Sequence, residues 1–70
     1  MTVSEYMHEE HLMKDDFSTI QDESSYWEKA GLFVLDNWED DVSELSEKQY
    51  NWLERIRDDM TERRIKGRLR

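Results

Sequence analysis

The chain contains no cysteine and no proline, and only two of its 70 residues are glycine. Without cysteine, a disulfide framework and a thiolate zinc site are both excluded, although these are the usual supports of small domains. The lack of proline and the scarcity of glycine disfavour a turn-rich β fold, and a charged fraction of 40% favours helices. We therefore expect an all-α fold, a single helical domain over residues 1–70 held together by packing.

Long apolar runs are also missing, since none approaches the roughly 20 residues that a membrane-spanning helix requires. The first ten residues lack the basic and apolar regions of a signal peptide. These absences predict a cytoplasmic protein without membrane association. A chain of this length buries only about 60% of the surface that its unfolded form exposes, so a partner or a second copy could complete the core.

Basic residues are scarce in the first two thirds of the chain. Residues 1–46 contain 13 Asp and Glu against two Lys, a charge of −11. Residues 47–70 contain eight Lys and Arg against five Asp and Glu, a charge of +3. The sequence is therefore dipolar, with a net charge of −8 and a basic C-terminal end at residues 61–70.

Three capping boxes predict where helices begin. In each S/T-x-x-E/Q box the hydroxyl accepts from the third helical amide, while the third side chain reaches back to the cap. The boxes pair Thr2 with Glu5, Ser25 with Glu28, and Ser46 with Gln49. Apolar residues then recur at helical spacing and mark three core-facing stripes: Tyr6, Met13, Phe17 and Ile20; Trp27, Ala30, Val34 and Trp38; Leu53, Ile56 and Met60. We expect a three-helix domain with short acidic connections near residues 21–25 and 39–45.

Two local features leave alternatives open. The first helix could run to about Ile20 or break earlier, because several side chains in residues 14–25 compete for backbone hydrogen bonds. Gly31 lies inside the second helix, where glycine costs on the order of 1 kcal/mol relative to alanine. Either another backbone passes close to Gly31, or the position is a weak point in the helix.

Residue types that catalyse reactions or bind metals form no recognisable site. His8 and His11 are three residues apart and would share a helix face, but no third ligand is evident, so a solvated face is the better interpretation. Adjacent carboxylates diverge by about 100° on a helix and do not form an acid and base pair. We therefore expect no enzymatic activity, no cofactor and no metal site.

The stretch DNWEDDVSELSE, residues 36–47, carries six carboxylates and no basic residue. A spaced row of carboxylates can resemble backbone phosphates to the basic groove of another protein. It can equally serve only to keep a small protein soluble. The candidate residues of an acidic partner-binding face are Asp36, Glu39, Asp40, Asp41 and Glu44.

The basic end of the chain predicts an alternative site, in which cationic side chains contact nucleic-acid phosphates. Its candidate residues are Arg55, Arg63, Arg64, Lys66 and Arg68. The acidic charge of the whole chain opposes such binding. Cations near a helix C-terminus are also favoured by the helix dipole alone.

Tryptophan supplies a third kind of candidate. Trp38 lies on the stripe of the second helix, whereas Trp52 lies about 40° from Ile56 and about 100° from Leu53, at the edge of the third stripe. An aromatic ring at such an edge is a candidate hot spot, although the edge of a core has the same pattern. We predict that Trp38 or Trp52 is an aromatic anchor for a partner.

The stretch LSEKQYNWLERI, residues 45–56, has the pattern Leu-Ser-x-Lys-Gln-x-x-Trp-Leu-x-x-Ile. It resembles a short helical segment of small phage and mobile-element accessory proteins of DNA replication, recombination and repair. The matching positions are Leu45, Ser46, Lys48, Gln49, Trp52, Leu53 and Ile56. The resemblance covers twelve of the 70 residues. It implies a setting, an accessory protein of a phage or similar element, and assigns no functional residue.

Three hypotheses follow. The first is a non-catalytic acidic protein, phage-derived, that binds and could inhibit a protein of nucleic-acid metabolism or host defence through that protein's basic groove. The second is an accessory nucleic-acid-binding protein that uses the basic C-terminal helix. The third is a homodimer that pairs the apolar stripe of the third helix.

Overall fold

The computed structural model describes the backbone of residues 1–68 and the side chains of residues 1–64. The helices are α1 (Val3–His8), α2 (Lys14–Ile20), α3 (Ser25–Asp36) and α4 (Glu47–Arg68), with a short 3-10 helix η1 (Val42–Glu44) before α4. The expected all-α fold is confirmed. No helix in the described part of the chain is long and apolar enough to span a membrane.

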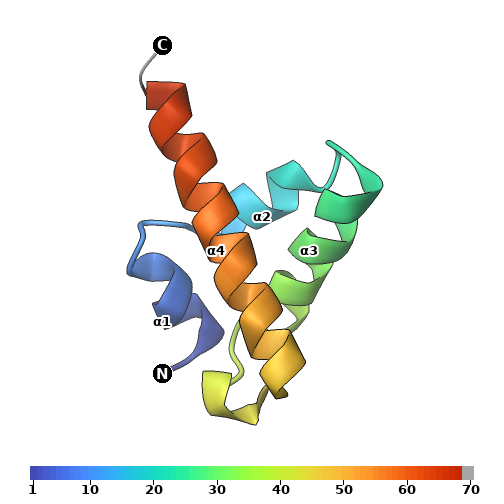
Figure 1. Ribbon diagram of the computed structural model, residues 1–70, viewed down its shortest axis with the longest axis vertical. Helices are drawn as coiled ribbons and strands as arrows, with labels where there is room; N and C mark the ends of the chain where they lie inside the picture. Colours follow the sequence, from blue (N-terminus) through green and yellow to red (C-terminus); the bar gives the residue numbers. More distant parts are fainter. Residues whose placement is uncertain (69–70) are drawn as a thin grey trace.

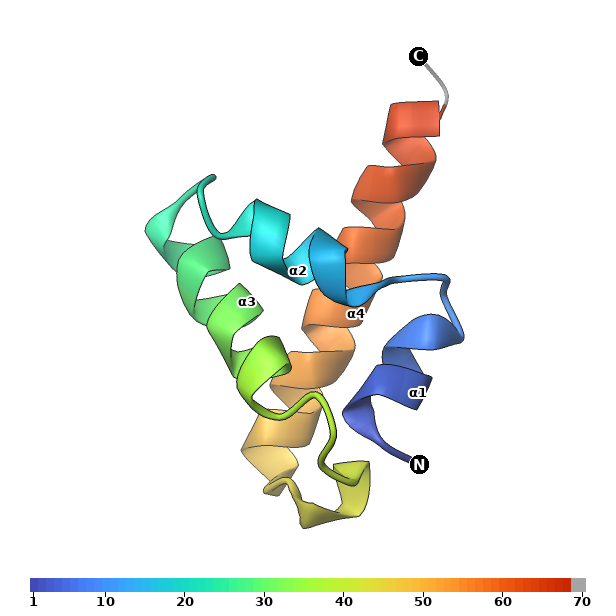
Figure 2. The same ribbon diagram turned by 180° about the vertical axis from the view of Figure 1, so that it is seen from behind.

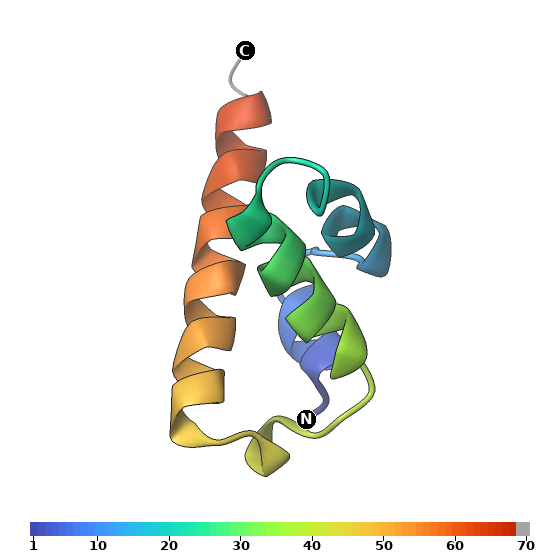
Figure 3. The same ribbon diagram turned by 90° about the vertical axis from the view of Figure 1, so that its right-hand side faces the viewer.

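The molecule has two layers. Helix α4 forms one layer, and α1, α2 and α3 pack against one side of it (Figure 3). The C-terminal turns of α4 extend past the other helices, and the connection from α3 to α4 lies at the opposite end, next to the N-terminus (Figure 1). Seen from behind, α2 lies across the middle of α4, and α1 and α3 lie on opposite sides of α4 (Figure 2).

The first predicted helix is in fact two helices. The capping box of Thr2 and Glu5 starts α1 as expected, but α1 ends at His8. His11 has a φ of 60°, in the left-handed region, so a continuous helix cannot pass through it. Helix α2 then starts afresh, because the Asp16 carboxylate accepts a hydrogen bond from the Met13 amide at 2.7 Å.

The later helix starts agree more closely with the sequence. The cap of α3 is Ser24 rather than Ser25: the Ser24 hydroxyl accepts from the Trp27 amide at 3.3 Å. The box of Ser46 and Gln49 is formed as predicted, with its two reciprocal hydrogen bonds at 3.0 and 3.2 Å.

The core draws residues from all four α-helices and from the turn after α1. Its buried members are Val3, Tyr6, Met7, Leu12, Phe17, Ile20, Ala30, Val34, Leu53, Ile56 and Met60. The predicted stripe of α4 is confirmed by Leu53, Ile56 and Met60. Met13, which the first stripe placed in the core, is instead 52% exposed, because the chain turns at His11 and Leu12 becomes buried in its place.

Gly31 lies where the backbone of α2 comes close to α3. A Cβ atom at Gly31 would lie 2.7 Å from the Phe17 carbonyl oxygen and 2.8 Å from Cγ of Gln21. The Phe17 carbonyl belongs to the backbone of α2 and cannot rotate away. Of the two explanations left open by the sequence, the close backbone neighbour is therefore confirmed.

Candidate protein-binding surface

The acidic segment, residues 36–47, connects α3 to α4. Asp36 is the last residue of α3, and Glu39, Asp40 and Asp41 follow in the turn that leads to η1. Glu44 ends η1. The segment lies at one end of the molecule, beside the N-terminus (Figure 1).

Backbone hydrogen bonds tie the acidic segment to the start of the chain. The amides of Val3 and Ser4 donate to the carbonyls of Asp40 and Trp38, at 2.9 and 3.0 Å. In the opposite direction, the Val42 amide donates to the Met1 carbonyl at 2.9 Å. Although the segment has little regular structure, its backbone is therefore held in place by main-chain contacts.

Asp41 has a structural role in this arrangement. Its carboxylate accepts from the Ser43 amide at 2.9 Å and lies 3.2 Å from the α-amino group of Met1. These hydrogen bonds, those from Ser43 first, lower the pKa of Asp41 to about 2. Asp41 is thus engaged within the chain, although its side chain remains 44% exposed.

The side chains of the other four predicted acidic residues have no partner among the described residues. The carboxylates of Asp36, Glu39, Asp40 and Glu44 are exposed, and none takes part in a hydrogen bond or ion pair with the described side chains. Of the five predicted residues of the acidic face, four therefore have carboxylates available to a partner, whereas the Asp41 carboxylate is engaged within the chain.

Both predicted aromatic anchors are partly buried and pack against the core. The Trp38 ring lies 5.9 Å from that of Phe17 and meets the His8 ring edge-on at 5.6 Å. The Trp52 ring stacks on that of Phe33, with centroids 4.6 Å apart and planes 16° apart. Each ring is fixed by an internal neighbour, and only the remainder of its surface is open to a partner.

Two of the predicted basic residues are engaged inside the chain. Arg63 donates to Glu23 at 2.6 Å and lies over the Trp27 ring at 5.4 Å. Arg64 donates to the carbonyls of Glu10 and His11, at 2.9 and 2.8 Å. Arg55 is exposed, and the side chains of Lys66 and Arg68 lie outside the described residues.

Arg57 makes the most extensive contacts of any basic side chain in the described part of the chain. Its guanidinium lies 4.2 Å from the centroid of the Tyr6 ring and donates to the Tyr6 carbonyl at 3.3 Å. It also forms ion pairs with Glu9 at 3.3 Å and Glu10 at 3.1 Å, so it joins α4 to α1. The sequence contained a signal for this role, because Arg57 lies about 40° from Leu53 on the helix, beside the apolar stripe.

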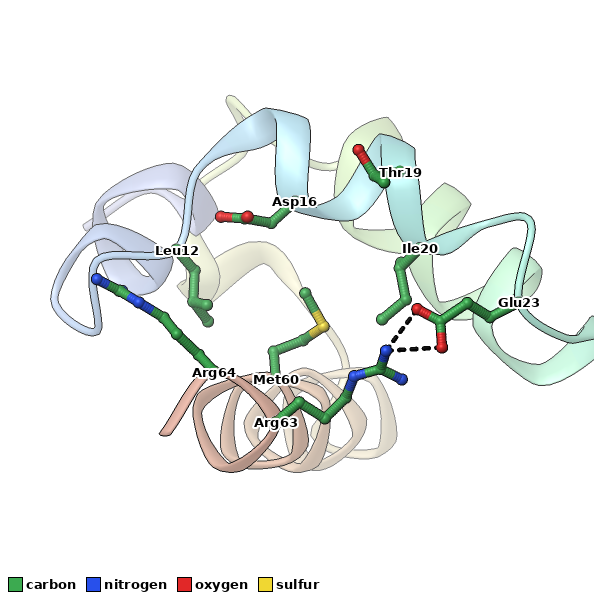
Figure 4. Close-up of a pocket in the computed structure, with 8 residues that line it drawn as sticks. All are labelled: Leu12, Asp16, Thr19, Ile20, Glu23, Met60, Arg63 and Arg64. Carbon is green, nitrogen blue, oxygen red and sulfur yellow. Dashed lines mark hydrogen bonds and ion pairs between the residues drawn. The ribbon is translucent and has the colours of Figure 1, made fainter. Parts of the chain in front are cut away.

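A pocket of about 320 Å³ lies between α2 and the C-terminal half of α4 (Figure 4). Leu12, Ile20 and Met60 supply its apolar lining, and the ion pair of Arg63 with Glu23 lies at one side. Both arginines that line the pocket have internal acceptors: Arg63 pairs with Glu23, and Arg64 donates to two backbone carbonyls.

His8 and His11 do not share a helix face as the sequence predicted. His8 ends α1, and His11 lies in the turn beyond it with a positive φ. No group of three or more potential metal ligands occurs among the described residues.

Comparison of the chain with protein-family models, with curated proteins and with solved structures finds no match.

Proposed function

We propose that this protein is a non-catalytic interaction protein that binds a partner's basic groove through its acidic segment. The observation that carries the proposal is the division of charge. The carboxylates of Asp36, Glu39, Asp40 and Glu44 are exposed on a segment held by main-chain hydrogen bonds, and they have no partner in the part of the chain that the structure describes. By contrast, Arg57, Arg63 and Arg64 of α4 donate to acceptors within the chain.

The braced backbone matters for affinity. A flexible acidic loop would lose conformational freedom on binding, whereas a segment that is already held by main-chain hydrogen bonds loses less. Unpaired carboxylates also attract a basic surface over several ångströms and so increase the rate of encounter. A partner that normally holds phosphates in its groove would accept such a row, which is the physical basis for inhibition by mimicry.

The resemblance of residues 45–56 suggests the setting of this proposal. It points to an accessory protein of a phage or similar element, whose partner takes part in nucleic-acid metabolism or host defence. The exposed part of Trp38 or Trp52 would supply the apolar contact beside the carboxylates. Because both rings pack on internal neighbours, the exposed edge of each ring is already held in position before a partner binds.

The alternatives receive less support from the contacts. For nucleic-acid binding through Arg63 and Arg64, phosphates would compete with the internal acceptors on Glu23, Glu10 and His11. A homodimer through the apolar stripe of α4 would have to displace the other helices, because Leu53 and Ile56 are fully buried within one chain and Met60 is 7% exposed.

The test compares two variants that remove the same number of negative charges. The segment variant carries Asp36→Asn, Glu39→Gln, Asp40→Asn and Glu44→Gln. The control variant carries four changes at exposed carboxylates elsewhere: Asp22→Asn, Glu28→Gln, Glu54→Gln and Asp58→Asn. Both are immobilised and exposed to extract of the producing cells, and the retained proteins are identified.

The proposal predicts that the wild type and the control variant retain the same basic protein and that the segment variant does not. Circular dichroism must show that all three chains are equally folded. Equal retention by the segment variant would show that the acidic segment does not form the interface. Equal loss in both variants would show that only overall charge matters.

A further inference from the structure

Beside the acidic segment, the first two turns of α4 carry a hollow of about 390 Å³ with the opposite charge. Lys48, Asn51, Trp52 and Arg55 line it, and we call it the Trp52 hollow. Their spacing of three, four and seven residues places them on one face of the helix. Lys48 follows Glu44, the last acidic residue of η1, by only four positions, so the hollow comes directly after the acidic segment along the chain.

The cations of this hollow differ from those that build the fold. Arg57, Arg63 and Arg64 all donate to internal acceptors. Lys48 and Arg55 are exposed, and neither forms an ion pair or hydrogen bond with the described side chains. The Trp52 ring between them is held by its stack on Phe33. The hollow is thus a fixed aromatic surface flanked by two available cations.

We infer that the Trp52 hollow receives a carboxylate of the same partner that binds the acidic segment, next to an apolar side chain that covers the indole. This inference rests on the proposed function. A partner whose docking surface were uniformly basic would be repelled by Lys48 and Arg55 as it reached the acidic segment, because like charges at an interface oppose binding. An acidic residue at that place converts the repulsion into an ion pair and fixes the orientation of the partner.

The experiment uses short peptides of defined charge and nuclear magnetic resonance of the nitrogen-labelled chain. The first peptide is a blocked pentamer that alternates glutamate with leucine. The second is the same pentamer with lysine in place of glutamate, and a thymidine oligonucleotide is the third ligand. The signals followed are the indole N–H of Trp52, assigned with Trp52→Phe, and the backbone amides of residues 36–55.

The glutamate peptide is expected to shift the Trp52 indole signal and the amides of residues 48–55. Lys48→Glu with Arg55→Glu should weaken this binding by about fivefold or more. Lys14→Glu with Lys29→Glu changes two exposed lysines elsewhere and should leave it unchanged. An absent shift, an equal shift with the lysine peptide, or a shift that survives the Lys48 and Arg55 changes would overturn the inference. So would a response to the oligonucleotide alone.

The same titrations keep this inference separate from the proposed function. The lysine peptide should shift the amides of Asp36, Glu39, Asp40 and Glu44, and this response reports on the acidic segment alone. If it is absent while the glutamate peptide still binds at Trp52, the proposed function fails and the hollow remains a site for acidic peptides. If only the lysine peptide binds, the result supports the proposed function of the acidic segment and overturns the inference about the Trp52 hollow.

Discussion

Gly31→Ala tests whether α2 and α3 pack as closely as the structure indicates. In an exposed helix interior, alanine would stabilise the protein by about 1 kcal/mol relative to glycine. Here the added Cβ would lie 2.7 Å from the Phe17 carbonyl oxygen, which is shorter than any normal contact. Because that oxygen is part of the backbone of α2, the helix must move, and overpacking of this kind costs about 1–3 kcal/mol.

We expect the cost to exceed the gain, so that Gly31→Ala lowers the free energy of unfolding by about 1 kcal/mol and at most by about 2 kcal/mol, at about 4–8 °C in melting temperature per kcal/mol for a domain of this size. Urea denaturation followed by circular dichroism measures it. Gln21→Ala combined with Gly31→Ala removes the second obstacle, Cγ of Gln21 at 2.8 Å, and should remain destabilised relative to Gln21→Ala alone. A stabilised Gly31→Ala protein would refute the close approach of the two helices.

Two further predictions concern the joint between α1 and α4. Arg57→Ala removes the hydrogen bonds to Tyr6, Glu9 and Glu10, so it should lower the free energy of unfolding, measured by urea denaturation, by about 1–2 kcal/mol. Arg57→Lys should recover less than half of this loss. A loss below about 0.5 kcal/mol in Arg57→Ala would contradict the role of Arg57 in joining the two helices. Burial, opposed by the nearby Arg57 cation, raises the pKa of Tyr6 to about 12, against about 10 in an unfolded chain. As the pH rises, the unfolded state loses the phenol proton before the folded state does, so the free energy of unfolding should fall between about pH 10 and 12. Tyr6→Phe should remove part of that fall. An alkaline denaturation profile that is the same in Tyr6→Phe as in the wild type would contradict the raised pKa of Tyr6.

Local signals in the sequence predicted helix starts and one core face well. The capping boxes at Thr2 and Ser46 form as expected because they depend on residues three positions apart. The α4 stripe of Leu53 and Ile56 is buried because a long helix with a regular apolar period has one way to face the core.

An early break of the first helix was one of the alternatives that the sequence left open, but its position after α1 could not be predicted, because a distant residue contacts the turn. His11 adopts a left-handed conformation while Arg64, 53 residues away, donates to its carbonyl. Leu12 becomes buried through this turn, although its place in the sequence lies off the predicted stripe. The same long-range contacts explain why Arg63 and Arg64 looked like candidates for phosphate binding: their internal acceptors lie 40 or more residues away.

The candidate surface was predicted in part. Sequence alone identified the acidic segment, but it could not separate Asp41, which accepts from Ser43 and pairs with the Met1 amine, from the four carboxylates that have no partner among the described side chains. It also could not identify the Trp52 hollow, because the availability of Lys48 and Arg55 depends on where every other charge in the fold is paired. Their role in binding stays a prediction.

The most direct test of the central claim is calorimetric titration of the captured partner with the wild type and with the segment variant, at low and moderate salt. The account predicts that the segment variant binds about tenfold more weakly or worse, and that its affinity depends less on salt than that of the wild type. A segment variant that keeps its fold and binds with the same affinity and the same salt dependence would contradict the claim that the acidic segment forms the interface.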